Sequence, residues 1–375
     1  MADNKDKKVL NVPALRFPEF TGEWERHKLS EVCSFYSGGT PSSSKKEYYN
    51  GNIPFIRSGE LHKDYTELFI TEAGLSNSAA KLVETGDLLL ALYGATSGDI
   101  AISKIKGAIN QAILCIRTKQ NKKFIESVWN KHVERLLQTY LQGGQGNLSA
   151  DIVKNIPFYF ANSNEQDKLA KFISLLDERI ATQNKIIEKL QSLIKGIAQH
   201  CIKESTSGNT YVKLGDICQI TTGKLDANAQ VDNGIYPFFT CAEQPFKIDS
   251  FAFDTEALLI SGNGANLGYI NYYKGKFNAY QRTYVLDLFS ENIQYIKWAL
   301  KVLLPKRIAI EKSSSNTPYI VLSTLTDLRL PIPCKSKQSF IANLMQSLER
   351  KLSNQIAQYD SYNYLKQYLL RQMFI

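Results

Sequence analysis

The chain has 375 residues, of which 43% are apolar and 22% are charged, and its formal net charge is +9. This composition is ordinary for a globular protein, and the length predicts roughly two or three domains, each able to bury a core. No run approaches the roughly 18 apolar residues of a membrane span, so we expect no membrane association. The positive charge is spread along the chain and favours a nucleic-acid partner only mildly.

The six cysteines include no Cys-x-x-Cys pair and are accompanied by only four histidines. We therefore expect no metal site, and we interpret the cysteines as free thiols in a reducing cytoplasm. The segment Met1–Lys8 is charged and contains no apolar stretch. A secretory signal is not expected there.

The first half of the chain predicts a module of mainly antiparallel strands with helices, followed by a long helix. Apolar runs at 86–94, 99–102 and 113–116 have the length and the flanking glycines typical of strands. A helix is expected at 124–141, and a much longer one extends from Gln166 to about Ile202.

The second half repeats this order, with strands expected at 257–262 and 268–272, a helix at 293–310, and a long helix at 338–374. The long helix recurs without a gap 172 residues after its first copy. Copies of this size are whole domains, because solenoid repeats have periods of roughly 20–50 residues. We predict an internal pseudo-twofold repeat of two globular domains and two helices, with segments 1–164, 165–204, 205–333 and 334–375.

Both long helices carry residues spaced alternately three and four apart, which predicts the a/d seam of a coiled coil. The seam positions are Ile173, Leu176, Ile180, Gln183, Ile187, Leu190 and Ile194, and then Met345, Leu348, Leu352, Gln355, Tyr359 and Tyr362. We expect the helices to form a long antiparallel pair that separates the modules, with the glutamines hydrogen-bonded to each other. The alternative is a seam that serves only as core or for self-association. The predicted fold class is α+β.

Three motifs could carry catalysis, and each has a simpler structural interpretation. Asn155-Ile156-Pro157-Phe158-Tyr159 faintly echoes the Asn-Pro-Pro-Tyr loop of adenine-N6 methyltransferases, but an extended exit from the module explains it better. Gly262-x-Gly264-x-x-x-Gly268 is interpreted as a turn between strands. The pair Asp177-Glu178 is interpreted as a solvated helix face. We predict no catalytic residue and no cofactor or metal bound by this chain.

Polar and basic side chains of the modules are the candidates for DNA contacts. Lysine suits phosphate oxygens, and arginine and glutamine can read base edges. Lys104 and Lys106 flank an expected hairpin; the alternative for every member is an ordinary solvated charge. The candidates are Lys45, Lys46, Arg57, His62, Lys63, Lys104 and Lys106 in the first module, and Lys224, Lys247, Lys274, Lys276, Gln281 and Arg282 in the second.

The order of short motifs, present twice, resembles the specificity (S) subunits of type I restriction-modification enzymes. The motifs include Val12-Pro13-x-Leu15-Arg16-Phe17, Ser37-Gly38-Gly39-Thr40-Pro41, Ile53-Pro54-Phe55-Ile56-Arg57 and Gly94-Ala95-Thr96-Ser97-Gly98. The second copy departs from the pattern, since Thr222-Gly223-Lys224 replaces the Gly-Gly-Thr-Pro turn.

The resemblance implies a non-catalytic DNA-recognition component of a bacterial defence system. Each module would be a target recognition domain that reads one half of a bipartite site in double-stranded DNA. The helices would set the spacing and dock two methyltransferase (M) subunits, which use S-adenosylmethionine. Restriction (R) subunits, which use ATP and Mg, would join through the assembled complex. The alternatives are a single-chain adenine-N6 methyltransferase and a coiled-coil protein scaffold.

Overall fold

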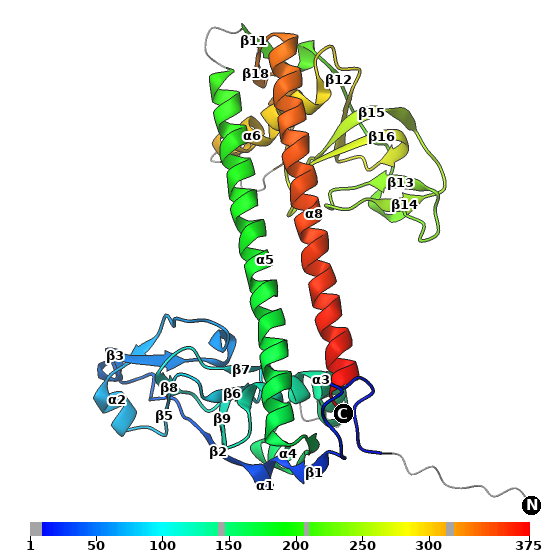
Figure 1. The fold of residues 1–375 in the computed structure, drawn as a ribbon. Coiled ribbons are helices and arrows are strands. Elements are labelled where there is room, and N and C mark those ends of the chain that lie inside the picture. The colour runs from blue at the N-terminus through cyan, green and yellow to red at the C-terminus, as the bar shows by residue number, and fades with distance from the viewer. Residues whose placement is uncertain (1–9, 142–146, 206–209, 313–318) are drawn as a thin grey trace, which may run out of the picture. The chain divides into compact units, whose positions relative to one another are not determined.

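The computed structural model describes residues 10–141, 147–205, 210–312 and 319–375, so the prediction for Met1–Lys8 lies outside the described residues. The chain divides into two compact units (Figure 1). Unit 1 comprises Met1–Gln183 and Gln358–Ile375, and unit 2 comprises Asn184–Ala357. None of the described helices is long and apolar enough to cross a membrane.

The described part of unit 1 contains three small sheets, with strand orders β1-β10, β2-β9-β6-β7 and β4-β3-β8-β5. All pairs are antiparallel except β3 with β8. The elements are β1 Glu25–Lys28, α1 Leu29–Val32, β2 Cys33–Ser37, η1 Lys46–Tyr48, β3 Tyr49–Ile56, η2 Ser58–Glu60, β4 Phe69–Ile70, α2 Glu72–Ser76, β5 Lys81–Val83, β6 Leu88–Ala91, β7 Ile100–Ile102, β8 Gly107–Ile109, β9 Ile113–Thr118, α3 Lys122–Leu141, α4 Ala150–Asn155, β10 Pro157–Phe160 and the first part of α5 Ser163–Glu204.

The strands predicted at 86–94, 99–102 and 113–116 are confirmed as β6, β7 and β9, and the helix predicted at 124–141 is confirmed as α3. The hairpin expected near Lys104 and Lys106 is wrong. β7 pairs with β6, whereas β8 pairs with β3 and β5, so this segment connects two different sheets.

The strand β6 is apolar throughout because it is buried on both faces. Leu88 and Leu90 join the core formed with α3, while Leu89 and Ala91 join a second cluster on the opposite face. A strand covered on both sides reads as a continuous apolar run rather than an alternating one. This accounts for the strength of the strand signal in the sequence.

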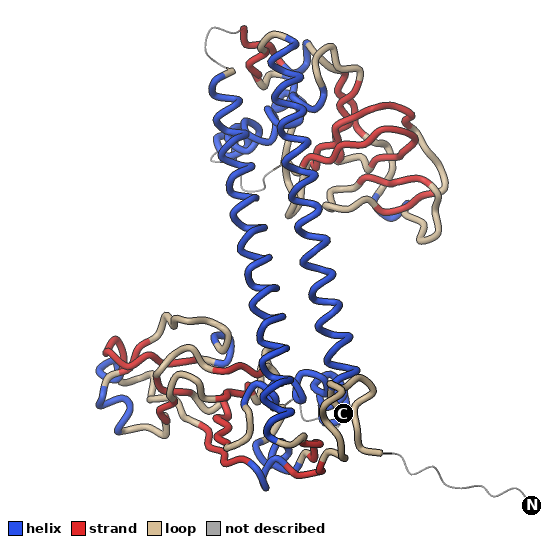
Figure 2. Tube along the Cα trace, in the orientation of Figure 1, coloured by secondary structure: helices blue, strands red, loops and turns tan. Residues whose placement is uncertain are grey.

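Unit 2 has the same topology, but two of its strands are long enough to join the equivalents of the two four-stranded sheets into one sheet of six strands. In the described residues its sheets have the orders β11-β18 and β12-β17-β15-β16-β13-β14, and in the larger one only β13 and β16 pair in parallel. Figure 2 shows the strands of both units in red and the helices in blue. The elements are β11 Thr210–Lys213, η3 Leu214–Asp216, β12 Gln219–Thr222, η4 Ala227–Ala229, β13 Tyr236–Phe239, β14 Phe246–Ile248, β15 Phe253–Ser261, β16 Ile270–Ala279, β17 Thr283–Asp287, α6 Ile293–Lys312, α7 Leu322–Thr326, β18 Arg329–Ile332 and the first part of α8 Lys335–Met373.

The internal repeat is therefore present in the strand pairing as well as in the sequence. β15 occupies the places of both β5 and β6, and β16 those of β7 and β8, because the second copy has long continuous strands there. The glycine motif at 262–268 is confirmed as a turn between β15 and β16, with Gly264 and Gly268 at φ of 78° and 82°. The equivalent residues Gly94 and Gly98 have φ of 87° and 85°.

The two long helices are α5, of 42 residues, and α8, of 39 residues, and each unit contains a part of both. Within unit 1 the two run antiparallel, since Asp177 pairs with Lys366 and Arg179 hydrogen-bonds Tyr362. Within unit 2 they also run antiparallel, since Lys337 Nζ donates to the carbonyl oxygen of Glu204. The predicted antiparallel arrangement is confirmed within each unit.

Every predicted seam residue is buried or half-buried. The heptad pattern therefore identifies the inward face of each helix correctly. Gln183 is 2% exposed and Gln355 is half-buried, but they belong to different units, so their mutual hydrogen bond stays a prediction.

A buried glutamine fastens each long helix to its own module. The Gln166 side chain accepts from the Asn121 backbone N–H at 3.2 Å and donates to the Ala161 carbonyl at 2.7 Å. Gln338 makes the equivalent bonds to Asn292 at 3.0 Å and to the Pro333 carbonyl at 2.9 Å. Because buried amides need partners for all their polar atoms, this contact fixes where each long helix begins.

Candidate nucleic-acid interface

In unit 1 the structure brings His62, Lys63 and Lys104 together. Lys104 Nζ donates to the His62 carbonyl oxygen at 3.3 Å, and both residues line a cavity of about 490 Å³. His62 Nε2 lies 2.8 Å from Asp99 Oδ1, and this hydrogen bond raises the pKa of the imidazole. The side chains of His62 and Lys104 are exposed and can contact a phosphate. The cavity that they line also contains the carboxylates of Asp99, Glu126, Asp177 and Glu178.

Arg57 is held by contacts within unit 1. Arg57 donates to Glu60 at 2.8 and 3.3 Å and lies 3.5 Å from Glu67. Burial raises the pKa of Glu60, but hydrogen bonds from Arg57 and Thr66 outweigh it and lower the value to about 2. An arginine engaged in this way is poorly placed to read a base edge.

Lys45, Lys46 and Lys106 are exposed but differ in their surroundings. Lys45 Nζ donates to the Tyr48 hydroxyl at 3.0 Å and lies 5.0 Å from the centre of its ring. Lys106 pairs with Glu84 at 3.1 Å. Surface pairs of this kind contribute little to stability and can exchange for a phosphate.

In unit 2, Lys224, Gln281 and Arg282 meet where β12 ends and β17 begins. The Gln281 backbone N–H donates to the Leu225 carbonyl at 2.9 Å, which places Lys224 beside the other two. All three residues are exposed, and their side chains make no ion pair or hydrogen bond with the described residues. An exposed guanidinium and amide side by side can each contact a base edge with two hydrogen bonds.

Lys247, Lys274 and Lys276 lie on β14 and β16, away from that corner in the strand order. Lys274 faces Glu256 across the β15–β16 ladder, with Nζ 3.6 Å from the carboxylate. Lys276 lies 4.6 Å from the centre of the Phe251 ring. Phe251 is 43% exposed, and the combination of lysine with an exposed ring is a contact that the sequence patterns did not reveal.

The structure also identifies Thr40 and Gln111 in unit 1, which the sequence analysis did not select. They hydrogen-bond each other and occupy the positions of the 224–225 turn and of Gln281. Gln111 precedes Gln281 by 170 residues, so alignment of the two strand starts could have revealed it. The same corner of both modules therefore carries exposed polar side chains.

Each module is tied to the long helices by a half-buried acid at equivalent positions. Asp177 Oδ2 and Oδ1 each lie 2.6 Å from a lysine Nζ, of Lys123 and Lys366 respectively. Burial raises the pKa of Asp177, but the two lysines lower it by a larger amount, so the pKa of this carboxyl group lies below its ordinary value. The interpretation of Asp177 as part of a solvated face is wrong, because only the neighbouring Glu178 is exposed.

Glu349, 172 residues after Asp177, holds Lys297 at 2.7 Å and Lys301 at 3.1 Å. The acid is retained in both copies, but its lysine partners differ: Asp177 is held by Lys123 of α3 and Lys366 of α8, whereas both partners of Glu349 lie on α6. Each pair orients its module on the helices of its own unit.

The methyltransferase-like motif is used for structure. Asn155 ends α4, where its amide donates to the Asp151 carbonyl at 2.9 Å, and residues 157–160 form β10 against β1. Phe158 is 4% exposed and stacks on His132. An aromatic ring packed in this way is unavailable to a flipped adenine. Among the described residues there is also no group of three or more histidine, cysteine or acidic side chains that could hold a metal.

A family model for the type I restriction modification DNA specificity domain matches residues 21–192 and 206–359. The chain therefore belongs to this family, with one match in each half. The prediction of a DNA-specificity component, rather than a single-chain methyltransferase or a scaffold, is confirmed at this level.

The chain is similar to the EcoDI specificity subunit of Escherichia coli, with 44% identity over 137 residues; this covers 36% of the chain and 30% of the relative. It is also similar to the MjaIX specificity subunit of Methanocaldococcus jannaschii, with 23% identity over 384 residues and 88% of each chain. The crystal structure of the type I S subunit from M. genitalium shares the fold, with a TM-score of 0.66 at 18% identity over 97% of this chain and 99% of that one.

Proposed function

We propose that residues 1–164 and 205–333 are target recognition domains, each of which reads one half of a bipartite site in double-stranded DNA. The observation that supports this most is that the two modules share a strand topology but differ in most side chains at the same corner, where Gln111 matches Gln281 but Ala112 stands in place of Arg282. The shared topology holds the reading surface in the same place in both modules. The different side chains on that surface would read two different half-sites.

At that corner, Arg282 and Gln281 of unit 2 are the proposed base readers, since both are exposed and unpaired with the described residues. Lys224 beside them suits a phosphate. In unit 1, His62, Lys63 and Lys104 are the proposed phosphate contacts. Each lysine–phosphate contact releases about one counterion, so binding should weaken steeply with salt.

The segments 165–204 and 334–375 are the proposed spacer helices, which set the distance between the half-sites and dock two M subunits. One exposed leucine at the same position of each helix supports two docking sites for the M subunit. Leu193 is 53% exposed and Leu365, 172 residues later, is 43% exposed. Exposed apolar residues at repeated positions suit two copies of one partner.

The catalytic steps belong to the proposed partners. The M subunits would supply S-adenosylmethionine and the transfer of a methyl group to adenine, and R subunits would bring ATP and Mg to the assembled complex. The cytoplasm, where such a complex meets DNA, is the proposed location.

Mapping of methylated adenines in a genome tests this proposal. Cells with the M subunit alone are compared with cells that contain the M subunit and this chain. The expected result is a split motif, two short specific sequences separated by a fixed gap, that appears only with this chain. Methylation without a motif, or the same motif without this chain, would contradict the proposal.

A further inference from the structure

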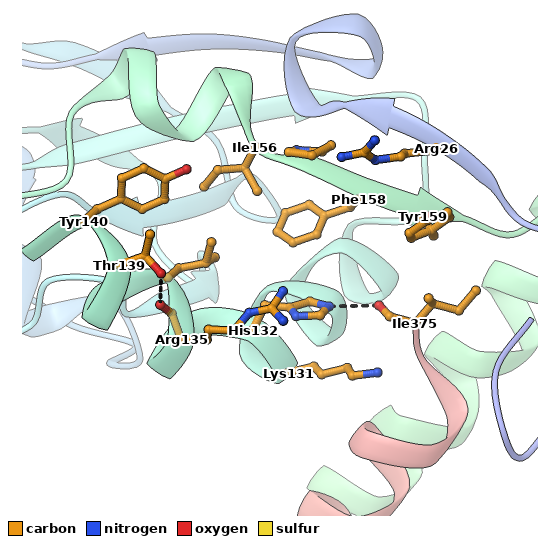
Figure 3. A pocket seen from close by; sticks show the side chains of 12 residues that line it. Arg26, Lys131, His132, Arg135, Thr139, Tyr140, Ile156, Phe158, Tyr159 and Ile375 are labelled. Carbon is orange, nitrogen blue, oxygen red and sulfur yellow. Dashed lines mark hydrogen bonds between the residues drawn. The ribbon is translucent and has the colours of Figure 1, made fainter. Parts of the chain in front are cut away.

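A second basic surface of unit 1 is a pocket of about 600 Å³ between α3, the β1–β10 pair and the end of α8 (Figure 3). Two arginines, one lysine and one histidine surround it, and aromatic rings form much of its wall. The side chains that matter for the argument are Arg26, Lys131, His132, Arg135, Tyr140 and Tyr159.

The positive charge of this pocket has no carboxylate partner among the described side chains that line it. The guanidinium groups of Arg26 and Arg135 make no ion pair or hydrogen bond with the described part of the chain. Among the described residues, Lys131 Nζ and His132 Nε2 contact the main-chain oxygens of Phe374 and Ile375 at the end of α8. Burial, and then the charge of Arg135, lower the pKa of Lys131, as expected for a partly buried cation beside another cation.

Lys131 and His132 hold the end of α8, but the equivalent helix and strand pair of the second copy form without most of these cations. The second copy retains the helix and the strand pair, but the positions equivalent to Arg26, Lys131 and His132 are Tyr211, Val302 and Leu303. Only Arg135 has a cationic counterpart, Lys306. Charge that one copy keeps and the other lacks indicates a ligand specific to unit 1.

The aromatic side chains indicate which anion fits. Phe158 and His132 stack with ring centres 5.5 Å apart, so these two faces cover each other. Tyr140, at 37% exposed, remains open at the rim, while Arg26 lies on the opposite wall (Figure 3). Converging cations beside an open ring are the combination that binds a phosphate and stacks its base.

We propose that this pocket binds one unpaired nucleotide of a nucleic-acid strand, with its phosphate on Arg26 and Arg135 and its base against Tyr140. A base within a duplex is stacked on its neighbours and cannot enter a concave site, whereas an unpaired base can. An acidic peptide would satisfy the cations but make no specific use of the ring. The site goes beyond the reading of duplex DNA and does not depend on which residues read the half-sites.

Fluorescence anisotropy with the full chain and a labelled hexathymidylate at fixed salt tests the site. Arg26→Ala, Arg135→Ala and Tyr140→Ala should each weaken binding about tenfold, and an abasic hexamer should bind the unchanged chain about tenfold more weakly. Lys306→Ala, at the position equivalent to Arg135 in the second copy, is the matched control and should bind like the unchanged chain. Circular dichroism confirms that each variant is folded.

Three results would overturn the site. Equal binding of the abasic and thymidylate hexamers would remove the stacking role of Tyr140. Equal weakening by Lys306→Ala would show general attraction to a basic protein. Displacement of the oligonucleotide by an equal concentration of hexaglutamate would show that the pocket takes acidic peptides instead.

Discussion

At the scale of single residues, the charges of this chain divide into those that hold the fold and those left for a partner. Arg57 and Lys297 are paired with carboxylates, whereas Lys224 and Arg282 are exposed and unpaired with the described residues. Sequence patterns treat both kinds alike, because spacing along the chain does not show which acid lies opposite a base. Arg57 therefore suits a DNA contact by its residue type, but in the structure its guanidinium group is occupied by Glu60.

Glu349 offers a test of the first kind of charge, since the Lys297 side chain opposite it is only 9% exposed. Glu349→Gln should lower the free energy of unfolding by about 2 kcal/mol at pH 7, because a nearly buried ammonium loses its charged partner. The expected loss is moderate because the Glu349 side chain is 32% exposed. Denaturant unfolding measures the difference, and Asp360→Asn, at an exposed acid of α8, is the matched control.

The pH dependence of the same variant gives a second readout. Burial raises the pKa of Glu349, but Lys297 and Lys301 lower it below the ordinary value of 4.5. A carboxyl group with a lowered folded pKa stabilises the protein above its unfolded pKa, and that contribution is lost as the pH falls through the folded pKa. The Glu349→Gln difference should therefore shrink below about pH 4.5. A difference independent of pH would exclude the ion pair as its source.

At the scale of elements, the long helices and the central strands were the most predictable parts. The alternating spacing of three and four selects the inward face of α5 and α8, and burial on both faces makes β6 and residues 257–260 of β15 continuously apolar. The short strands β4, β5 and β8 carry too few residues for a periodic signal. Their pairing depends on contacts distant in sequence. For this reason the segment at Lys104 resembles a hairpin in the sequence, although it connects two sheets in the structure.

The seam itself can be tested with neighbouring residues of α5. Ile187 is 8% exposed and Ile186 is 42% exposed, so they differ in burial but not in helix propensity. Ile187→Asp should lower the free energy of unfolding by about 3 kcal/mol or more, because it removes a buried side chain and adds an unpaired charge. Ile186→Asp should cost less than about 1 kcal/mol. Combining Ile180→Asp with Ile187→Asp should also weaken assembly with the M subunit in sedimentation experiments; equal effects of Ile186→Asp and Ile187→Asp would contradict the seam.

At the scale of the whole chain, the two copies have diverged unevenly. The glutamine at the start of each long helix and the acid at Asp177 and Glu349 are kept, and the strand order is the same. The corner keeps one glutamine, Gln111 and Gln281, but its other side chains and the pocket of unit 1 differ between the copies. Divergence concentrated on exposed side chains is what two independent reading surfaces on one shared scaffold require.

Exchange of residues 205–333 for the corresponding module of another family member tests this independence. The motif methylated by the assembled complex should change in one half-site, while the other half-site and the gap stay the same. The exchange removes Lys297 and Lys301 but leaves Glu349 on α8, so the incoming module needs a cation at one of these positions. A module without it should give a complex that reads the same new half-site but unfolds at a lower denaturant concentration, and restoring lysine at the position of Lys297 should recover stability without changing the motif. A change in both half-sites would show that the two modules do not read DNA independently.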